Sequence, residues 1–160
     1  MDLEDLIQRH RQHGLLIDAN LLVLYMIGTV NKSRITKFKR TEKYTARDFE
    51  ALRSILAQFA RVITTPHILT EVSNLARPLG KEQAAFSRAF SRWIDAADER
   101  FEASREIARQ PLFARLGLTD AAVASATRKE MLVLTDDLDL YLALARAGAD
   151  CINFSHIRPL

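Results

Sequence analysis

The chain has 160 residues, of which 48% are hydrophobic and 27% charged, and these values fit one compact globular domain over residues 1–160. They exclude an intrinsically disordered tail and a repeat array. The formal net charge of +3 permits nucleic acid as a partner but does not require it.

Cysteine usage and hydropathy predict a soluble, cytoplasmic protein. The single cysteine, Cys151, cannot form an internal disulfide and argues against a cysteine-rich zinc module. Residues 1–14 are charged throughout and hold no apolar signal core. The longest uncharged run, Ala19–Asn31, is shorter than the roughly 20 residues that a membrane span needs, so we expect no membrane segment.

Short apolar runs alternate with longer helical patterns along the chain. The runs have the length of buried parallel strands and lie at Leu15–Ile17, Arg61–Thr64, Met131–Leu134 and Cys151–Phe154. The helical patterns cover Ala19–Ile27, Thr45–Phe59, Pro66–Leu79, Glu82–Ala96, Glu99–Arg109, Asp120–Lys129 and Asp139–Ala147. This alternation predicts an α/β fold, a three-layer α/β/α sandwich around a mostly parallel sheet, with ligands bound beyond the carboxyl ends of the strands.

Two helix boundaries are predicted from local chemistry. Thr65 is placed to cap a helix that has Pro66 at its first position, where the missing N–H costs nothing. Gly148 follows Ala147, where a left-handed residue is wanted at a helix end.

Acidic residues follow two of the predicted strands. Asp18 directly follows the first run, and Asp136, Asp137 and Asp139 follow the third. Capping of the next helix explains an isolated aspartate at such a position, so the structural alternative for Asp18 is an N-cap. Three acids within four residues exceed what a cap needs.

Two further acids lie in predicted helices. Asp120 lies in the first turn of an alanine-rich helix, where Thr119 is available as the cap and the helix dipole alone explains an acid. Glu71 lies too deep in its helix to act as a cap, at the edge of the apolar stripe and facing the rim of the sheet. The structural alternative for Glu71 is an ion pair with His67 or Arg77.

Taken together, these acids predict a metal site. An α/β fold brings the ends of different strands and helices to one edge of the sheet, where the carboxylates would repel one another unless protonated or neutralised by a cation. Oxygen ligands without cysteine or a required histidine match Mg²⁺ or Mn²⁺ rather than zinc. Such a metal suits hydrolysis of a phosphodiester, because it activates water and stabilises the departing alkoxide.

Four segments occur in the order and with the residues of a known family. They are Leu15–Asn20, with an apolar-Asp-x-Asn pattern, Thr70–Val72 with a helical glutamate, Leu118–Ala122 with Thr-Asp-Ala, and Thr135–Leu140 with Thr-x-Asp-x-Asp followed by leucine. In these motifs the chain resembles the PIN-domain nucleases, and in particular the VapC-like ribonuclease toxins of bacteria and archaea, which usually have phenylalanine where this chain has Leu140.

The resemblance implies a PIN-like fold and a divalent-metal-dependent endoribonuclease, the toxin of a toxin–antitoxin pair, with Mg²⁺ or Mn²⁺ as cofactor, RNA as substrate and an antitoxin protein as partner. The catalytic and metal-binding acids that it implies are Asp18, Glu71, Asp120 and Asp137. Asp139 is implied as an additional metal-binding acid, and Asn20 and Thr135 as supporting residues. The Thr-x-Asp spacing favours Asp137, with Asp136 as the alternative.

Thr29–Arg47 is longer and more basic than in compact members of that family, with seven Lys or Arg residues against Glu42 alone. As a flexible loop it could contact RNA phosphates, and Phe38 or Tyr44 would offer a surface for base stacking. The candidate RNA contacts are Lys32, Arg34, Lys37, Lys39, Arg40 and Lys43. The alternative is a solvated loop or a surface for an acidic partner.

An aromatic stripe in the pattern Glu82–Ala96 has two interpretations. Its members are Phe86, Phe90, Trp93 and Ile94. Ordinary core packing explains them, and the alternative is an interface for a homodimer or an antitoxin helix. The chain's histidines have no metal-ligand spacing, and Cys151 has no partner that would suggest a thiol nucleophile.

Two other functions compete with the nuclease. A phosphatase would use Asp18 as its nucleophile, but the second acid expected two residues later is replaced by Asn20. A catalytically inert PIN-fold module would bind RNA or protein without cutting, although all four acids are present.

Overall fold

Parallel strands form the central sheet of the computed structural model, which describes residues 2–127 and 130–159. The strands in this part of the chain are β1 (Leu15–Ile17), β2 (Val62–Thr64), β3 (Asp98–Glu99), β4 (Leu132–Thr135) and β5 (Cys151–Asn153). They pair in the order β3-β2-β1-β4-β5, and each pairing is parallel. The predicted α/β fold is therefore confirmed.

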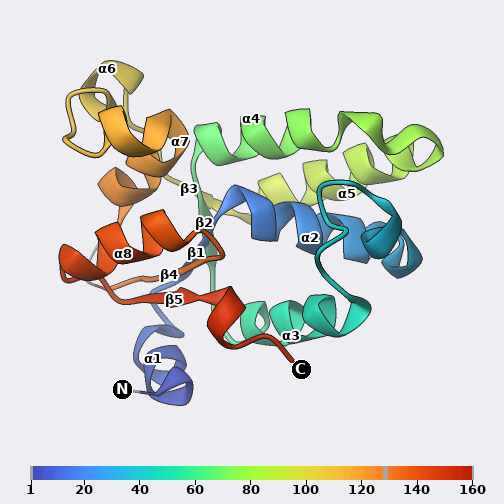
Figure 1. Cartoon of the computed structure of the whole chain (residues 1–160), viewed down its shortest axis with the longest axis horizontal. Helices are drawn as coiled ribbons and strands as arrows, with labels where there is room; N and C mark the ends of the chain where they lie inside the picture. The colour runs from blue at the N-terminus through green and yellow to red at the C-terminus, as the bar shows by residue number, and fades with distance from the viewer. Residues whose placement is uncertain (1, 128–129, 160) are drawn as a thin grey trace.

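Helices cover both faces of this sheet (Figure 1). The α-helices are α1 (Leu3–His10), α2 (Ala19–Val30), α3 (Ala46–Leu56), α4 (Pro66–Leu75), α5 (Gln83–Ala96), α6 (Ser104–Ile107), α7 (Phe113–Ala126) and α8 (Leu138–Arg146). Short 3₁₀ helices are η1 (Lys32–Lys37), η2 (Arg77–Glu82) and η3 (Phe154–His156). In the view of Figure 1, α1 and α3 lie below the sheet and α4, α7 and α8 above it, which gives the three-layer sandwich. No helix in the described part of the chain is long and apolar enough to cross a membrane.

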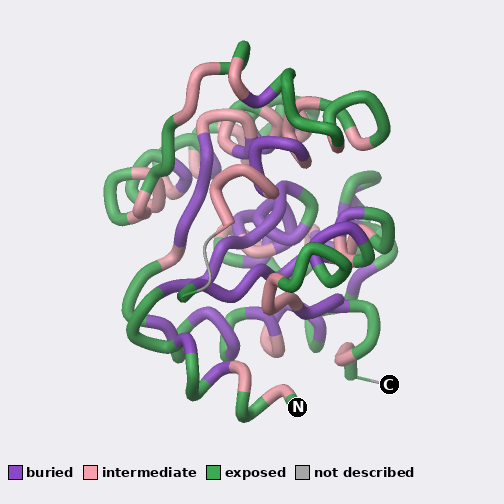
Figure 2. The backbone as a smooth tube through the Cα atoms, turned by 90° about the vertical axis from the view of Figure 1, so that its left-hand side faces the viewer, coloured by how far each residue is buried: buried purple, intermediate pink, exposed green. Residues whose placement is uncertain are grey.

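The core is centred on β1, β4 and α2. Figure 2 shows buried backbone running through the middle of the molecule. Every residue of β1 and β4 is buried, since both strands are covered by helices on two faces. Helix α2 contacts α3, α4 and α5, which explains why its sequence is apolar on all sides. Each fully buried large apolar side chain contributes roughly 1.5–3 kcal/mol relative to an exposed one.

Two predicted boundaries are confirmed by their hydrogen bonds and backbone angles. The Thr65 hydroxyl accepts a hydrogen bond from the Ile68 N–H at 3.2 Å, with Pro66 at the start of α4. Gly148 has φ +80° directly after α8 and its C-cap Ala147, the left-handed conformation that glycine adopts without strain.

The prediction of a helix over Glu99–Arg109 is wrong. Asp98–Glu99 form the edge strand β3, and the Arg100 N–H donates to the Thr64 carbonyl at 2.8 Å. Only Ser104–Ile107 are helical. A two-residue polar strand at a sheet edge has no apolar alternation, and pairing with β2 overrides the local helical pattern.

Other helices differ from the predictions in their ends. Helix α4 ends at Leu75 rather than Leu79, because Pro78 and a left-handed Gly80 replace regular helix with η2. Helix α7 begins at Phe113, before the predicted Asp120, and bends at Gly117, whose φ is +84°. The predicted end of that helix, Lys129, lies outside the described residues.

Candidate functional site

The strand order creates a switch point between β1 and β4. The chain leaves β1 towards β2 on one side, and leaves β4 towards β5 on the other. Open parallel sheets bind ligands at such a point, beyond the carboxyl ends of the strands. Asp18 follows β1 here and Asp136 and Asp137 follow β4, so the topology brings the first and last predicted acids together.

Asp18 links the two strand ends and also caps α2. One carboxylate oxygen, Oδ1, accepts from the Leu21 N–H at 3.0 Å. The other, Oδ2, accepts from the Thr135 hydroxyl and from the Asp136 N–H. The predicted alternative of an N-cap is therefore correct, yet capping uses only one of these contacts. A carboxylate offers about four lone-pair sites, so three protein donors leave Asp18 one more interaction.

The charge on Asp18 is unfavourable in this structure. Only 6% of the residue is exposed. Burial, followed by repulsion from Asp136, raises the pKa of Asp18 to about 7, although the hydrogen bonds from Thr135, Leu21 and Asp136 oppose the shift. A cation would relieve this penalty.

Thr135 organises the end of β4. Its buried hydroxyl donates to Asp18 and accepts from the Asp137 N–H at 3.0 Å. Asp137 in turn caps α8, because its Oδ1 accepts from the Leu140 N–H at 2.9 Å. Asp139 lies in the first turn of α8 and is exposed.

Glu71, Asp120 and Asp137 bring negative charge together from α4, α7 and the start of α8. Partial burial, then the charges of Asp137 and Glu71, raise the pKa of Asp120 to about 6. Within residues 2–127 and 130–159, none of the three forms an ion pair with a basic side chain. The predicted structural alternative for Glu71, a pair with His67 or Arg77, is therefore not formed by these described residues.

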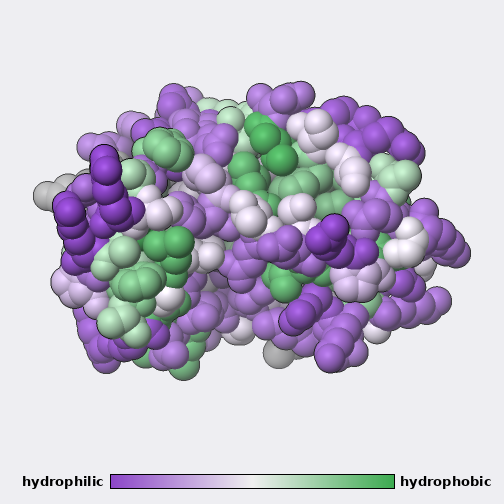
Figure 3. All heavy atoms as spheres, turned by 90° about the horizontal axis from the view of Figure 1, so that it is seen from above, coloured by the Kyte–Doolittle hydropathy of each residue, from purple (hydrophilic) through white to green (hydrophobic). Residues whose placement is uncertain are grey.

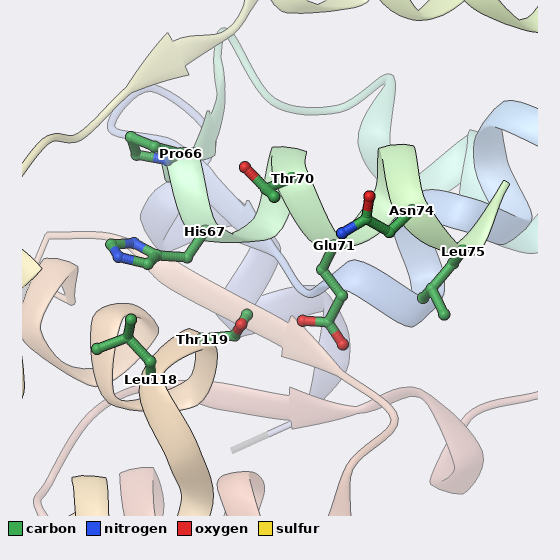
Figure 4. A pocket seen from close by; sticks show the side chains of 8 residues that line it. All are labelled: Pro66, His67, Thr70, Glu71, Asn74, Leu75, Leu118 and Thr119. Atoms are coloured by element: carbon green, nitrogen blue, oxygen red, sulfur yellow. The ribbon is translucent and has the colours of Figure 1, made fainter. Parts of the chain in front are cut away.

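A cleft of about 540 Å³ opens beside this acidic group. It is lined by Pro66, His67, Thr70, Glu71, Asn74, Leu75, Leu118 and Thr119. Figure 4 shows the Glu71 carboxylate extending from α4 towards Thr119, the neighbour of Asp120 in the chain, with Asn74 further along the same helix. The cleft therefore runs between α4 and α7 and contains one of the predicted acids.

Asp136 has different surroundings from Asp137. Its side chain is only 1% exposed, and its Oδ2 accepts from the Lys43 ammonium at 2.6 Å and from the Tyr44 hydroxyl. The Asn20 amide is 3.5 Å from Asp136 Oδ1, a marginal hydrogen bond. The negative charge of Asp136 is thus neutralised by Lys43, and this leaves Asp137 as the better candidate for a ligand.

The basic segment Thr29–Arg47 is not the open loop that its composition predicted. It contains η1, and Phe38 and Tyr44 are buried in the main core. The prediction that these rings offer a stacking surface is therefore wrong, because burial of a large aromatic ring in the core removes its faces from solvent.

Three of the candidate RNA contacts form ion pairs within the chain, and one of them is Lys43 with Asp136. Lys32 pairs with Glu50, and Arg34 lies 3.8 Å from Glu82. Lys37, Lys39 and Arg40 are exposed, and the Lys43 side chain is also open to solvent on one side, so these four residues remain candidates for contact with RNA.

Arg158 is a residue of this region that the sequence analysis missed. Its guanidinium binds both carboxylate oxygens of Asp48, at 2.6 and 3.0 Å, and donates to the Lys43 carbonyl at 2.8 Å. Burial alone would raise the pKa of Asp48, but the hydrogen bonds from Arg158 and Thr45 outweigh it and lower the pKa. The contact spans 110 positions in the chain, and no local pattern signals it.

No three histidine, cysteine, aspartate or glutamate side chains among the described residues stand in an arrangement that could hold a metal ion. The acids form two neighbouring groups instead, Asp18 with Asp136, and Asp120 with Asp137 and Glu71.

No protein-family model, no curated protein and no solved structure matches the chain.

Proposed function

We propose that this protein is a divalent-metal-dependent endoribonuclease. One observation carries the proposal: carboxylates with unfavourable negative charge gather at the switch point of a parallel sheet, beside an open cleft. Hydrolysis of a phosphodiester is the reaction class that this donor set suits best, since it offers oxygen ligands for Mg²⁺ or Mn²⁺ and no side-chain nucleophile of its own.

The chemistry of the donor set fits a hard divalent cation. Asp18, Glu71, Asp120 and Asp137 supply only oxygen atoms, and the raised pKa values of Asp18 and Asp120 are what a bound cation would reverse. When bound, such a cation lowers the pKa of a water molecule and neutralises charge on the phosphate. Glu71 has three rotatable side-chain bonds and is half-buried, so it can turn towards the other acids.

The protein's own contribution is the arrangement of these groups. Thr135 fixes the Asp18 carboxylate and the Asp137 backbone with a single hydroxyl. The cleft along α4 offers Thr70, Asn74 and Thr119 as polar contacts for the sugar–phosphate backbone of a bound strand. Prepositioned ligands and substrate contacts reduce the reorganisation needed at the moment of reaction.

If the nuclease is the toxin of a toxin–antitoxin pair, its antitoxin would bind away from the acidic cleft, in the groove between α4 and α5. This groove has a volume of about 490 Å³, and its lining includes Phe86, Phe90 and Ile94. Phe86 and Phe90 are buried core residues, as the first interpretation predicted, while Trp93 and Ile94 are partly buried at its edge. Figure 3 shows an apolar area over α4 and α5 within a mostly hydrophilic face. We propose that an antitoxin helix or a second copy of the chain binds in this groove. We propose that the protein acts in the cytoplasm.

The test is RNA cleavage with purified protein in Mg²⁺ or Mn²⁺ and in EDTA. We expect cleavage only with metal, and a loss of at least about 100-fold in Asp18→Asn and Asp120→Asn variants whose circular dichroism is unchanged. Glu4→Gln, which alters an exposed carboxylate in α1, outside the acidic group, is the control. Equal cleavage by all variants would contradict the mechanism.

The inert-module alternative has its own signature. In that case RNA would bind without being cut, and calorimetric titration with Mn²⁺ would show no heat.

A further inference from the structure

We propose that Lys43 is a fixed phosphate-binding cation at the acidic edge of the sheet, anchored by Asp136 and Tyr44 and positioned by Arg158. That this phosphate belongs to an RNA strand rests on the proposed function. The inference assigns separate roles to the two adjacent acids, because Asp136 holds the lysine while Asp137 stays with the carboxylates of the cleft.

The ammonium group of Lys43 is held from two sides. Its Nζ lies 2.6 Å from Asp136 Oδ2 and 5.0 Å from the centroid of the Tyr44 ring, a cation–π contact. Asp136 and Tyr44 are themselves fixed, because the Asp136 side chain is buried and Tyr44 belongs to the core. A lysine whose rotamers are already restricted loses less entropy when it binds a ligand.

The same ammonium group is open to solvent on its remaining side. The Lys43 side chain is 57% exposed. An ammonium has three N–H donors, and one of them points to Asp136, so others are available to an anion. Lysine binds phosphate as a point charge and needs no fork geometry.

The backbone of Lys43 is fixed by the C-terminal segment. The Arg158 guanidinium donates to the Lys43 carbonyl at 2.8 Å, and it lies 5.2 Å from the centroid of the Tyr44 ring. Asp48, whose side chain is buried, holds Arg158 through two hydrogen bonds. Arg158 is therefore a positioning residue: it contacts the carbonyl and the ring that determine where the lysine lies.

The location explains why a phosphate-binding cation is needed. Asp136 lies directly after β4, beside Asp18 and next to Asp137 in the chain. A phosphate that approaches these carboxylates meets like charge, and a fixed cation at the same edge offsets that repulsion. If Lys43 served only to neutralise Asp136, its exposure would be a disadvantage, because water weakens an ion pair.

Lys32 provides a matched comparison within the same basic segment. It also pairs with a carboxylate, that of Glu50, and its Nζ lies 5.8 Å from the centroid of the Phe49 ring. Both of its partners belong to α3 and not to the switch point. The two lysines therefore share their local chemistry and differ in their location.

The experiment measures binding of a 5′-fluorescein-labelled single-stranded RNA of 20 nucleotides by fluorescence anisotropy in EDTA, over a series of KCl concentrations. We expect Lys43→Ala to weaken binding about 5- to 10-fold at low salt and to reduce the slope of log Kd against log salt by about 0.7, the value for one lost phosphate contact. Lys43→Arg should bind within about 2-fold of the wild type, as should Lys32→Ala.

Arg158→Ala tests the positioning role. We expect it to weaken RNA binding and to lower the salt slope as Lys43→Ala does, whereas a purely structural role would lower Tm and leave the slope unchanged. Because Lys43→Ala leaves Asp136 without its cation, the double variant Lys43→Ala/Asp136→Asn is measured as well. It should retain the wild-type circular dichroism and the loss of RNA binding.

Unchanged affinity and slope in both Lys43→Ala and the double variant would overturn the inference and leave Lys43 as a counter-ion of Asp136 alone. Binding in EDTA does not depend on catalysis. A chain that binds RNA through Lys43 but never cleaves it would therefore refute the proposed nuclease and keep this inference. A metal-dependent nuclease indifferent to Lys43 would do the reverse.

Discussion

The hydroxyl of Thr135 donates a hydrogen bond to Asp18 Oδ2, joining two residues that are 117 positions apart in the chain. The same oxygen accepts from the Asp137 N–H, so one buried atom connects the ends of β1 and β4 with the start of α8.

Thr135→Val keeps the shape of the side chain and removes the hydroxyl. Asp18 then loses a donor, and the partly buried N–H of Asp137 loses its acceptor. We expect the free energy of unfolding to fall by about 1–3 kcal/mol, with a larger proportional loss of RNA cleavage, and Thr135→Ser to retain most of both. Urea denaturation and a cleavage assay check this. A stable, fully active valine variant would show that the hydroxyl organises nothing.

The pKa of Asp18 predicts how stability depends on pH in metal-free protein. The unfolded chain ionises this carboxyl near its ordinary value of 3.8, whereas the folded protein keeps it protonated up to about pH 7. The contribution of Asp18 to the free energy of unfolding is therefore fully present below about pH 4 and is lost as the pH rises to about 7. Relative to wild type, Asp18→Asn should gain stability between pH 4 and pH 8, on the order of 3 kcal/mol.

The measurement for this prediction is urea denaturation of both proteins in EDTA across that range, with Asp139→Asn as an exposed-site control. A stability difference between Asp18→Asn and wild type that stays constant with pH would contradict the assigned environment of Asp18.

Divalent metal should stabilise the folded protein. A ligand that binds only the native state at 100 times its Kd adds about 2.7 kcal/mol to the free energy of unfolding. We expect Mn²⁺ to raise Tm in the wild type, and Asp120→Asn to lose most of this increase, because Asp120 lies in the field of Glu71 and Asp137. Differential scanning fluorimetry with Mn²⁺ and with Ca²⁺ checks it. If Mn²⁺ raised the Tm of the Asp120→Asn variant as much as that of the wild type, the metal would bind elsewhere.

Gly28 of α2 packs directly against the ring of Phe49 in α3. A Cβ atom at this position would collide with the buried ring of Phe49. We expect Gly28→Ala to lower the free energy of unfolding by about 1–3 kcal/mol, despite alanine's helix propensity advantage of about 1 kcal/mol. Phe49→Leu in the same chain should restore part of the loss. Denaturant titration of the four proteins gives the coupling energy, and additive effects would exclude the collision.

The sheet could be predicted from sequence because its strands are short apolar runs followed by polar residues. β1 was predicted at its observed bounds, and β2, β4 and β5 within one residue at each end. Edge strand β3 could not be predicted, because Asp98 and Glu99 are in a strand only through pairing with β2. The end of α4 was missed for a similar reason, since the apolar spacing continues to Leu79 although regular helix does not.

For the candidate site, sequence reasoning found the acids and missed the residues around them. The predicted strand ends placed Asp18 directly after β1 and Asp137 two residues after β4, because parallel topology brings both strand ends to one edge of the sheet. Tyr44 was misjudged, since composition describes the charge of a segment and not which of its side chains enter the core. The contact of Arg158 with Asp48 depends on tertiary packing alone.

The pairing of β1 with β4 has a consequence for how the molecule assembles. These strands are neighbours in the sheet, but β2 and β3 intervene between them in the chain. Contacts between residues far apart in the chain form slowly, because the entropy of the intervening loop is lost before the contact contributes any stability. We therefore expect the carboxylates at the junction to meet late in folding, so that affinity for a divalent ion during refolding would report formation of the whole sheet rather than of either half.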